Sequence, residues 1–290
     1  MLLPSRQNTI SAILATLGAL ALSSLMALAK QLHPGIPTAL VIFMKSSFGL
    51  IFLIPFLISN RKSFVKTKKL PWHILRVTLA ASTMLCTYYA YRNLPIAFAT
   101  SVGMSGPLFT TLLSAILLKE NISPLKWLII ILGYIGVIII IKPTTFLLDF
   151  GTASALLANL LAACTIIVVK ILSRYDSTLT IMIYSNIGIT LLSFVFNING
   201  WQALSLKDLM LLSFIGILSL ITQFCSVTAL KYSTPSFVAP FEYMRIPFAI
   251  LIGLIIFDEI PAISTIIGSV IIIFSAYMLS CLSNKNSSNN

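Results

Sequence analysis

Two stretches of this sequence share one pattern: LPIAFATSVGMSGPLFTTLLSAILLKENI at residues 94–122 and TPSFVAPFEYMRIPFAILIGLIIFDEI at residues 234–260. In each stretch a proline opens an apolar segment, a second proline interrupts it, and a charged residue followed by glutamate closes it. The matched residues lie 139 or 140 positions apart: Pro95 with Pro235, Pro107 with Pro247, and Glu120 with Glu259. This shared order and spacing indicates an internal repeat of half the chain.

The composition around these stretches identifies the solvent in which the chain folds. Of its 290 residues, 58% are hydrophobic and only 9% are charged, whereas a soluble domain carries about 25% charged residues. A water-soluble protein of this size cannot bury so much apolar surface in its core, so we expect the chain to lie in a lipid bilayer. The net charge of +12 does not indicate nucleic acid, because the basic residues occupy short loops between apolar runs.

The apolar runs predict the helices. A membrane-spanning helix needs about 20 mostly apolar residues, and the connections between such runs are too short for an inserted soluble domain. Ten runs qualify: Thr9 to Ala29, Pro37 to Ser59, Pro71 to Tyr91, Ile96 to Leu118, Pro124 to Ile141, Gly151 to Leu172, Thr178 to Phe196, Leu206 to Leu230, Ser236 to Phe257, and Pro261 to Leu282. The Asn/Ser-rich tail, residues 283–290, is predicted to be disordered.

The internal repeat and the ten apolar runs together predict how the helices are arranged in the membrane. Each half holds five helices, an odd number, so the second half enters the membrane in the opposite sense. We therefore expect an all-α membrane protein of ten transmembrane helices in two inverted repeats, residues 1–142 and 150–282. Inverted repeats are typical of secondary transporters, which bind their substrate near the midplane between the halves.

The distribution of basic residues predicts the orientation. The loop between the second and third runs is the richest in basic residues: Arg61, Lys62, Lys66, Lys68 and Lys69. If this loop is cytoplasmic, most other loop lysines and arginines are cytoplasmic as well, and so are both termini. The sequence thus predicts a multi-pass protein of a bacterial inner membrane.

Four ionisable residues lie well inside the runs: Lys45, Arg76, Glu242 and Arg245. Burying such a group costs roughly 2.5–3.5 kcal/mol, so these residues usually face a cavity or a partner. Glu242 and Arg245 are three residues apart and share a helix face, which suits either a substrate site or a structural salt bridge. Lys45 lies near mid-depth and favours a cavity, whereas Arg76 is closer to a helix end and either lines the substrate site or snorkels.

Aromatic and amide side chains complete the predicted substrate site. Cations are attracted to aromatic faces, and an adenine ring can stack on them; the candidates are Tyr88, Tyr89, Phe241 and Tyr243. Asn186 and Gln223 either line the site or form hydrogen bonds between helices. Glu120 and Glu259 lie at helix ends, where they make local contacts or take part in gating.

Other kinds of function find little support. The four cysteines and two histidines have no metal-site spacing, so we expect neither a metal nor a cofactor. A membrane enzyme would need paired acids or a nucleophile, and Glu242 is the only deep acid. A structural assembly factor remains an alternative, although it would not need buried charges.

The repeated segment resembles the EamA domain of the drug/metabolite transporter superfamily, one domain in each half. The stretch WHILRVTLAASTMLCTYYAYRNLPIAFATSVGMSGPLF, residues 72–109, is similar to the S-adenosylmethionine uptake transporters of obligate intracellular bacteria, as is APFEYMRIPFA, residues 239–249. In the latter the order of acidic and basic residues departs from that group, which leaves the substrate open.

The resemblance implies a secondary transporter of a small polar metabolite, with S-adenosylmethionine uptake as the leading expectation. Export of amino acids or other metabolites and transport of nucleotide sugars are the alternatives. The direction of transport, the coupling ion and the oligomeric state are not predicted.

Overall fold

A computed structural model of the chain describes residues 4–33, 35–59, 67–94, 102–141, 150–197, 200–258 and 262–288. All regular structure in these residues is helical. The elements are α1 (Pro4–Lys30), α2 (Thr38–Ser59), α3 (Leu70–Asn93), α5 (Gly106–Leu117), α6 (Pro124–Ile141), α7 (Phe150–Leu172), α8 (Thr178–Phe196), α9 (Leu206–Tyr232), α10 (Pro235–Val238), the 3₁₀ helix η1 (Ala239–Met244), α11 (Arg245–Phe257) and α12 (Ile263–Ser288).

The helices have the length and composition of membrane spans. In the described part of the chain, six helical segments are long and apolar enough to cross a bilayer, if α10, η1 and α11 are counted as the one segment Pro235–Ile256. α5, α6 and α12 contain shorter apolar stretches. Large apolar side chains such as Leu128, Leu191 and Val270 are more than half exposed on the outside of the bundle, as expected where lipid replaces water. The chain is therefore a multi-pass membrane protein.

Both repeated segments are broken helices. The predicted spans Ile96 to Leu118 and Ser236 to Phe257 are not continuous: the first turns at Met104 and Ser105 before α5, and the second runs through α10, η1 and α11. Each break precedes a proline, Pro107 or Pro247, in the first turn of a new helix. Proline is tolerated there because first-turn amides have no intrahelical acceptor.

The two broken segments also end alike. Lys119 follows α5 with a φ of 53°, and Asp258 follows α11 with a φ of 51°. A left-handed residue commonly ends a helix, and these are the non-glycine residues with positive φ in the described part of the chain. The match extends the repeat from the sequence to the backbone.

One prediction of disorder differs from the structure. α12 continues as a helix to Ser288, so most of the tail predicted to be disordered from Ser283 onward is helical. No proline or glycine interrupts this stretch, and extending an existing helix is far easier than nucleating one.

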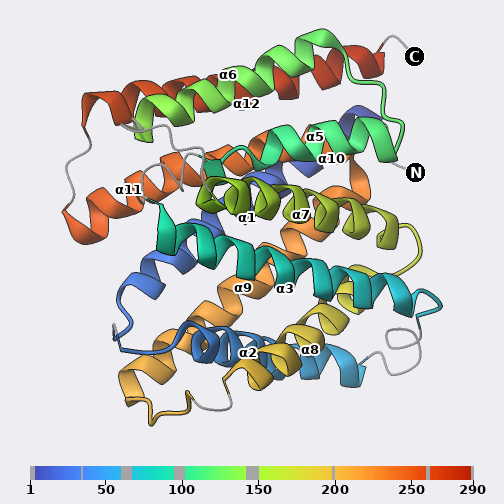
Figure 1. The fold of residues 1–290 in the computed structure, drawn as a ribbon. Coiled ribbons are helices and arrows are strands. Elements are labelled where there is room, and N and C mark those ends of the chain that lie inside the picture. The colour runs from blue at the N-terminus through green and yellow to red at the C-terminus, as the bar shows by residue number, and fades with distance from the viewer. Residues whose placement is uncertain are drawn as a thin grey trace.

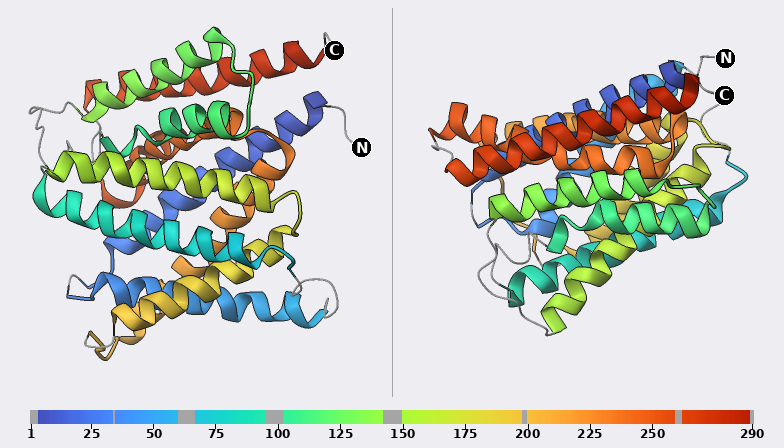
Figure 2. Two further views of the ribbon diagram at one scale, coloured as in Figure 1. Left: turned by 45° about the vertical axis from the view of Figure 1, so that its right-hand side comes forward. Right: turned by 90° about the horizontal axis from the view of Figure 1, so that it is seen from above.

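The helices pack chiefly between the two halves of the chain. α1 packs along α9, α3 along α7, α2 along α8 and α9, and α6 along α12. Figures 1 and 2 show α6 and α12 side by side along one edge of the bundle and α2 and α8 at the opposite edge. Each close pair joins one helix before residue 142 to one after residue 149.

The α6–α12 pair approaches closely through two glycines. A Cβ atom built on Gly268 would lie 2.5 Å from the carbonyl oxygen of Gly136, and one on Gly136 would lie 2.8 Å from that of Gly268. Small residues of this kind allow helix backbones to meet in a membrane, where van der Waals packing drives association.

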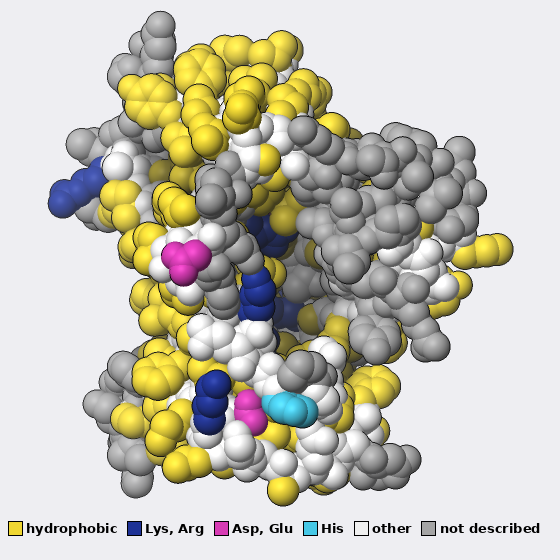
Figure 3. Space-filling view, turned by 90° about the vertical axis from the view of Figure 1, so that its left-hand side faces the viewer, with side chains coloured by type: hydrophobic (Ala, Val, Ile, Leu, Met, Phe, Trp, Pro, Cys, Tyr) yellow, Lys and Arg dark blue, Asp and Glu magenta, His cyan; other side chains and the backbone are white. Residues whose placement is uncertain are grey.

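The bundle has two distinct ends. We call the end at which α1 begins and α12 ends the terminal face, and the opposite end the distal face (Figure 1). Seen from the distal side, the molecule is hollowed near its centre, and lysine or arginine side chains lie within the hollow (Figure 3).

Candidate substrate-binding site

Two cavities lie between the helices. The charged cavity has a volume of about 240 Å³ and is lined by Ala15, Gly18, Ala19, Leu22, Thr222, Ser226, Val238, Glu242 and Arg245. The aliphatic cavity has a volume of about 470 Å³ and is lined by Pro37, Thr38, Ala39, Ile42, Lys45, Val77, Ala80, Ala81, Met84, Leu85, Ile189, Leu192, Ser193 and Phe196.

The broken second-half segment brings the acid and base of the charged cavity together. Glu242 lies in η1 and Arg245 begins α11. A 3₁₀ helix has three residues per turn, so side chains three positions apart point the same way. Both residues line the cavity, yet among the described residues no ion pair within 4.0 Å joins them. The salt bridge that the sequence allowed is therefore not formed.

Arg245 has few acceptors of its own. Its Nη2 donates to the thioether sulfur of Met104 over 3.1 Å, and its buried Nε has no hydrogen-bond partner among the described residues. Thioether sulfur is a weak acceptor, whereas guanidinium matches a carboxylate or phosphate with two parallel bonds. The guanidinium is thus held in the wall of the cavity with capacity left for an anion.

The neighbouring helices fix the position of this group. The Ser23 hydroxyl of α1 donates to the carbonyl oxygen of Arg245 over 2.8 Å. α1 contributes only small or aliphatic side chains to the cavity, while α9 contributes the hydroxyls of Thr222 and Ser226. The result is a small chamber with a carboxylate and a guanidinium on one wall and hydroxyls on another.

The other predicted charges lie elsewhere. Lys45 lines the aliphatic cavity. Arg76 is buried, lines neither of these two cavities, and donates from Nη1 to the carbonyl oxygen of Ile181 over 2.9 Å. Its guanidinium thus joins α3 to α8.

The predicted amide and aromatic residues do not line these two cavities either. Nδ2 of Asn186 donates to Oε1 of Gln223 over 3.1 Å, so these amides form the predicted alternative, a bond between α8 and α9. Phe241 packs on Phe237 in the apolar core, and Tyr243 is fully buried. Tyr89 is 48% exposed on the outside, and the side chain of Tyr88 lies outside the described part of the structure.

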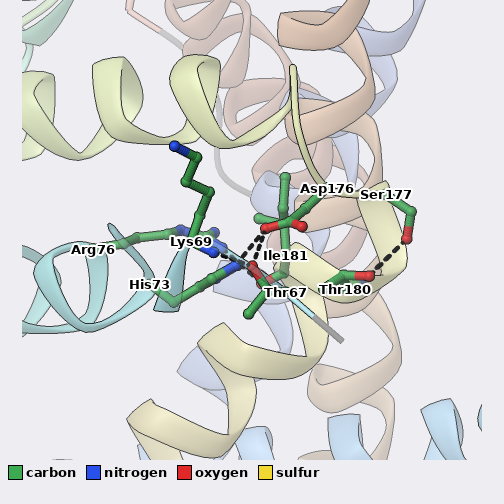
Figure 4. Close-up of polar contacts among 8 residues, drawn as sticks. All are labelled: Thr67, Lys69, His73, Arg76, Asp176, Ser177, Thr180 and Ile181. Atoms are coloured by element: carbon green, nitrogen blue, oxygen red, sulfur yellow. Dashed lines mark hydrogen bonds and ion pairs between the residues drawn. The ribbon is translucent and has the colours of Figure 1, made fainter. Parts of the chain in front are cut away.

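The terminal face carries contacts between helices that the sequence analysis did not predict. Figure 4 shows Thr67 and His73 directed at Asp176 in the turn between α7 and α8. Nε2 of His73 lies 2.8 Å from Oδ2 of Asp176, and the Thr67 hydroxyl donates to the same oxygen over 2.7 Å. His73 also stacks on Tyr184, with ring centroids 4.6 Å apart.

A second cluster on the same face involves Glu120. Its Oε2 accepts hydrogen bonds from the hydroxyls of Ser114 and Ser236, which join the end of α5 to the start of α10. Nearby, Nζ of Lys170 donates to the carbonyl oxygens of Leu230 and Ser233. Glu259 lies outside the described residues. The sequence offered one indication of both clusters: their residues lie at or near helix ends that the predicted topology places at the same end of the bundle.

Comparison with protein families agrees with this geometry. The model of the EamA-like transporter family matches the chain twice, over residues 9–142 and 149–281. The chain belongs to this family. It is accordingly a transporter and not an enzyme. A solved structure with 15% sequence identity shares the fold, with a TM-score of 0.78 over 97% of this chain and 98% of the other.

Relatives of this EamA-like transporter differ in their named substrates. It is 28% identical to the riboflavin transporter of Vibrio cholerae, covering 87% of this chain and 86% of that protein. It is 30% identical to the S-adenosylmethionine uptake transporter of Rickettsia bellii, covering 80% of each. It is 27% identical to the pseudopaline exporter CntI of Pseudomonas aeruginosa, covering 92% of this chain and 95% of that one.

Proposed function

We propose that this protein is a secondary transporter that takes up S-adenosylmethionine across a bacterial inner membrane by alternating access. The observation that carries the proposal is the unpaired Glu242 and Arg245 in one wall of the charged cavity. The ammonium of an α-amino-acid group can pair with Glu242, and its carboxylate can pair with Arg245. S-adenosylmethionine, the substrate named for one relative, carries such a group, whereas riboflavin, the substrate named for another, is uncharged at neutral pH.

We also propose that the halves are inverted repeats, with the terminal face in the cytoplasm. The packing supports this: the first helix of each half packs on the third of the other, as α1 on α9 and α3 on α7, while α2 and α6 pack on their own counterparts. A two-fold axis in the membrane plane generates this exchange. With this orientation, the hollow on the distal face (Figure 3) would open to the outside, and the contacts of His73 and Glu120 would join helices at the cytoplasmic end.

The test is uptake of radiolabelled S-adenosylmethionine into liposomes that contain the purified protein. We expect saturable uptake that is inhibited by S-adenosylhomocysteine, which shares the amino-acid group, and not by riboflavin. Saturable uptake of riboflavin without S-adenosylmethionine uptake would contradict the proposal. Uptake equal to that of empty liposomes for both compounds would contradict it as well.

Two variants connect this result to the site. Arg245→Gln and Glu242→Gln each remove one charge-assisted contact, for which we expect affinity to fall about 10- to 100-fold. Lys207→Met is the matched control, because this lysine is exposed at the distal face and lines neither cavity. If both site variants take up substrate as well as the control does, the substrate does not bind at these residues.

A further inference from the structure

The aliphatic cavity has a lining unlike that of the charged cavity. Its walls come from α2, α3 and α8, and the side chains are nearly all hydrocarbon. α3 contributes Val77, Ala80, Ala81, Met84 and Leu85, which form one stripe of a helix. The only hydroxyls in the lining belong to Thr38 and Ser193, and that of Ser193 is already donated to the carbonyl oxygen of Ile189 over 2.6 Å. Such a surface solvates a hydrocarbon chain far better than a polar metabolite.

The cavity is continuous with the apolar outer surface of the helices. Leu85 and Phe196, on its α3 and α8 walls, are 56% and 61% exposed. Both lie in the distal part of their helices, where the surface of a membrane protein contacts lipid chains. A molecule that enters here passes over apolar side chains and does not need to cross the charged cavity.

The apolar lining of the aliphatic cavity includes one cationic side chain, that of Lys45. Lys45 is the charged residue among the lining residues, and its ammonium makes no hydrogen bond or ion pair with any described residue. The Cα–Cβ bonds of a helix lean toward its N-terminus, so the side chain leans toward Thr38 and the distal face. A cation buried among hydrocarbon is costly without an anion beside it.

We propose that the aliphatic cavity binds an anionic amphiphile, a molecule with one acyl chain and a carboxylate or phosphate group. The anion meets the ammonium of Lys45, and the chain lies on the α3 stripe toward Val77 and the bilayer midplane. The bound molecule then has the orientation of a lipid in the distal leaflet of the membrane. Its head group lies at Lys45, nearer the distal surface, and its chain reaches Val77, deeper in the membrane. The site is separate from Glu242 and Arg245, and the inference does not depend on which substrate is transported.

Photocrosslinking with a diazirine derivative of hexadecanoic acid tests the site in the full-length protein in liposomes. We expect crosslinked peptides from α2, α3 or α8, and competition by unmodified hexadecanoic acid or lysophosphatidic acid but not by the uncharged methyl ester. Crosslinks confined to other helices would overturn the proposal. Equal competition by the methyl ester would also overturn it, because the cavity would then recognise only the chain.

Two variants test separately the charge of Lys45 and the open volume of the aliphatic cavity. Lys45→Met keeps the length of the side chain and removes its charge, and we expect probe affinity to fall about tenfold or more. Ala81→Phe fills the cavity and should abolish crosslinking, while Lys207→Met should label like the unmodified chain. Thermal unfolding in detergent shows whether each variant is folded. Folded Lys45→Met protein that labels as strongly as the control would contradict the role of the lysine.

Two further competitors exclude other occupants. Displacement of the probe by inorganic phosphate alone would show a small-anion site and overturn the amphiphile. Displacement by saturating S-adenosylmethionine would show that the cavity belongs to the transport path. If S-adenosylmethionine uptake fails in the liposome assay and the probe still competes as expected, this inference stands without the proposed function.

Discussion

The guanidinium of Arg245 donates to the sulfur of Met104 across 3.1 Å, and this contact joins the helix break of one half to the helix break of the other. Met104 begins the turn before α5. Met244, which is the counterpart of Met104 and lies 140 residues later, directly precedes Arg245. The two broken segments therefore meet at the wall of the charged cavity. Several expectations follow from this contact and from those on the terminal face.

Replacing Met104 with leucine should weaken substrate binding without unfolding the protein. Leucine has a similar volume but no acceptor, so Arg245 loses this hydrogen bond and can turn to Glu242 instead. An ion pair between these residues would then compete with the substrate. We expect KM to rise roughly two- to tenfold with little change in kcat, in line with the strength of one hydrogen bond. Initial uptake rates measure this, with Met210→Leu on the exposed side of α9 as the control.

Replacing Asp176 with asparagine should favour opening of the terminal face. The change removes the charge that faces His73 while keeping the shape of the side chain, and a hydrogen bond to a charged group is worth about 1.5–3 kcal/mol. We expect cysteines introduced beside the charged cavity to react faster with a maleimide applied from the terminal side. Asp208→Asn removes a carboxylate that accepts from the His33 amide on the distal face and serves as the control. Equal labelling of both variants would show that Asp176 does not hold this face closed.

Glu120 and Ser236 should be energetically coupled. Glu120→Gln and Ser236→Ala each remove one partner of the contact between α5 and α10, so the double variant should be only slightly less stable than either single variant. We expect a coupling energy of about 1–3 kcal/mol, as found for neighbours in one hydrogen-bond network. Unfolding in detergent measures it. Strict additivity would mean that the contact contributes nothing to stability.

Gly268→Val should loosen α12 from α6. A Cβ atom at this position would lie 2.4 Å from Cγ1 of Ile140, and overpacking of this kind costs roughly 1–3 kcal/mol. We expect a lower unfolding temperature in detergent. Gly106→Ala is the control, because its added carbon would lie 3.4 Å from the nearest atom, Oδ1 of Asn159. A stable Gly268→Val protein would show that the two helices can separate without loss.

The sequence predicted the helices better than it predicted the directions of their side chains. The spans Pro124–Ile141 and Thr178–Phe196 agree with the structure to the residue, because a bilayer demands a fixed length of apolar chain. The sequence indicated the helix breaks within the two repeated spans less clearly. Hydropathy remains high through η1 and across the turn before α5, and only the prolines indicate that the backbone changes there.

Depth in the membrane follows from position along a helix, but the cavity to which a side chain turns depends on tertiary packing. Glu242 and Arg245 lie beside one cavity and Lys45 beside the other, whereas Arg76 bonds to a backbone carbonyl. The pairing of Asn186 with Gln223 depends on how α8 meets α9. The contact between His73 and Asp176 joins residues 103 positions apart, a separation at which a single sequence contains no pairing signal.

The contact between α6 and α12 has a consequence for how the protein is made. α6 leaves the ribosome well before α12, the helix on which it packs, because α7, α8, α9, α10, η1 and α11 lie between them in the sequence. During the intervening time the glycine face of α6 borders only lipid or a helper protein of the insertion machinery. A chain that stops before Gly268 would leave that face permanently without its partner, so the packing of α6 is completed only when α12 has entered the membrane.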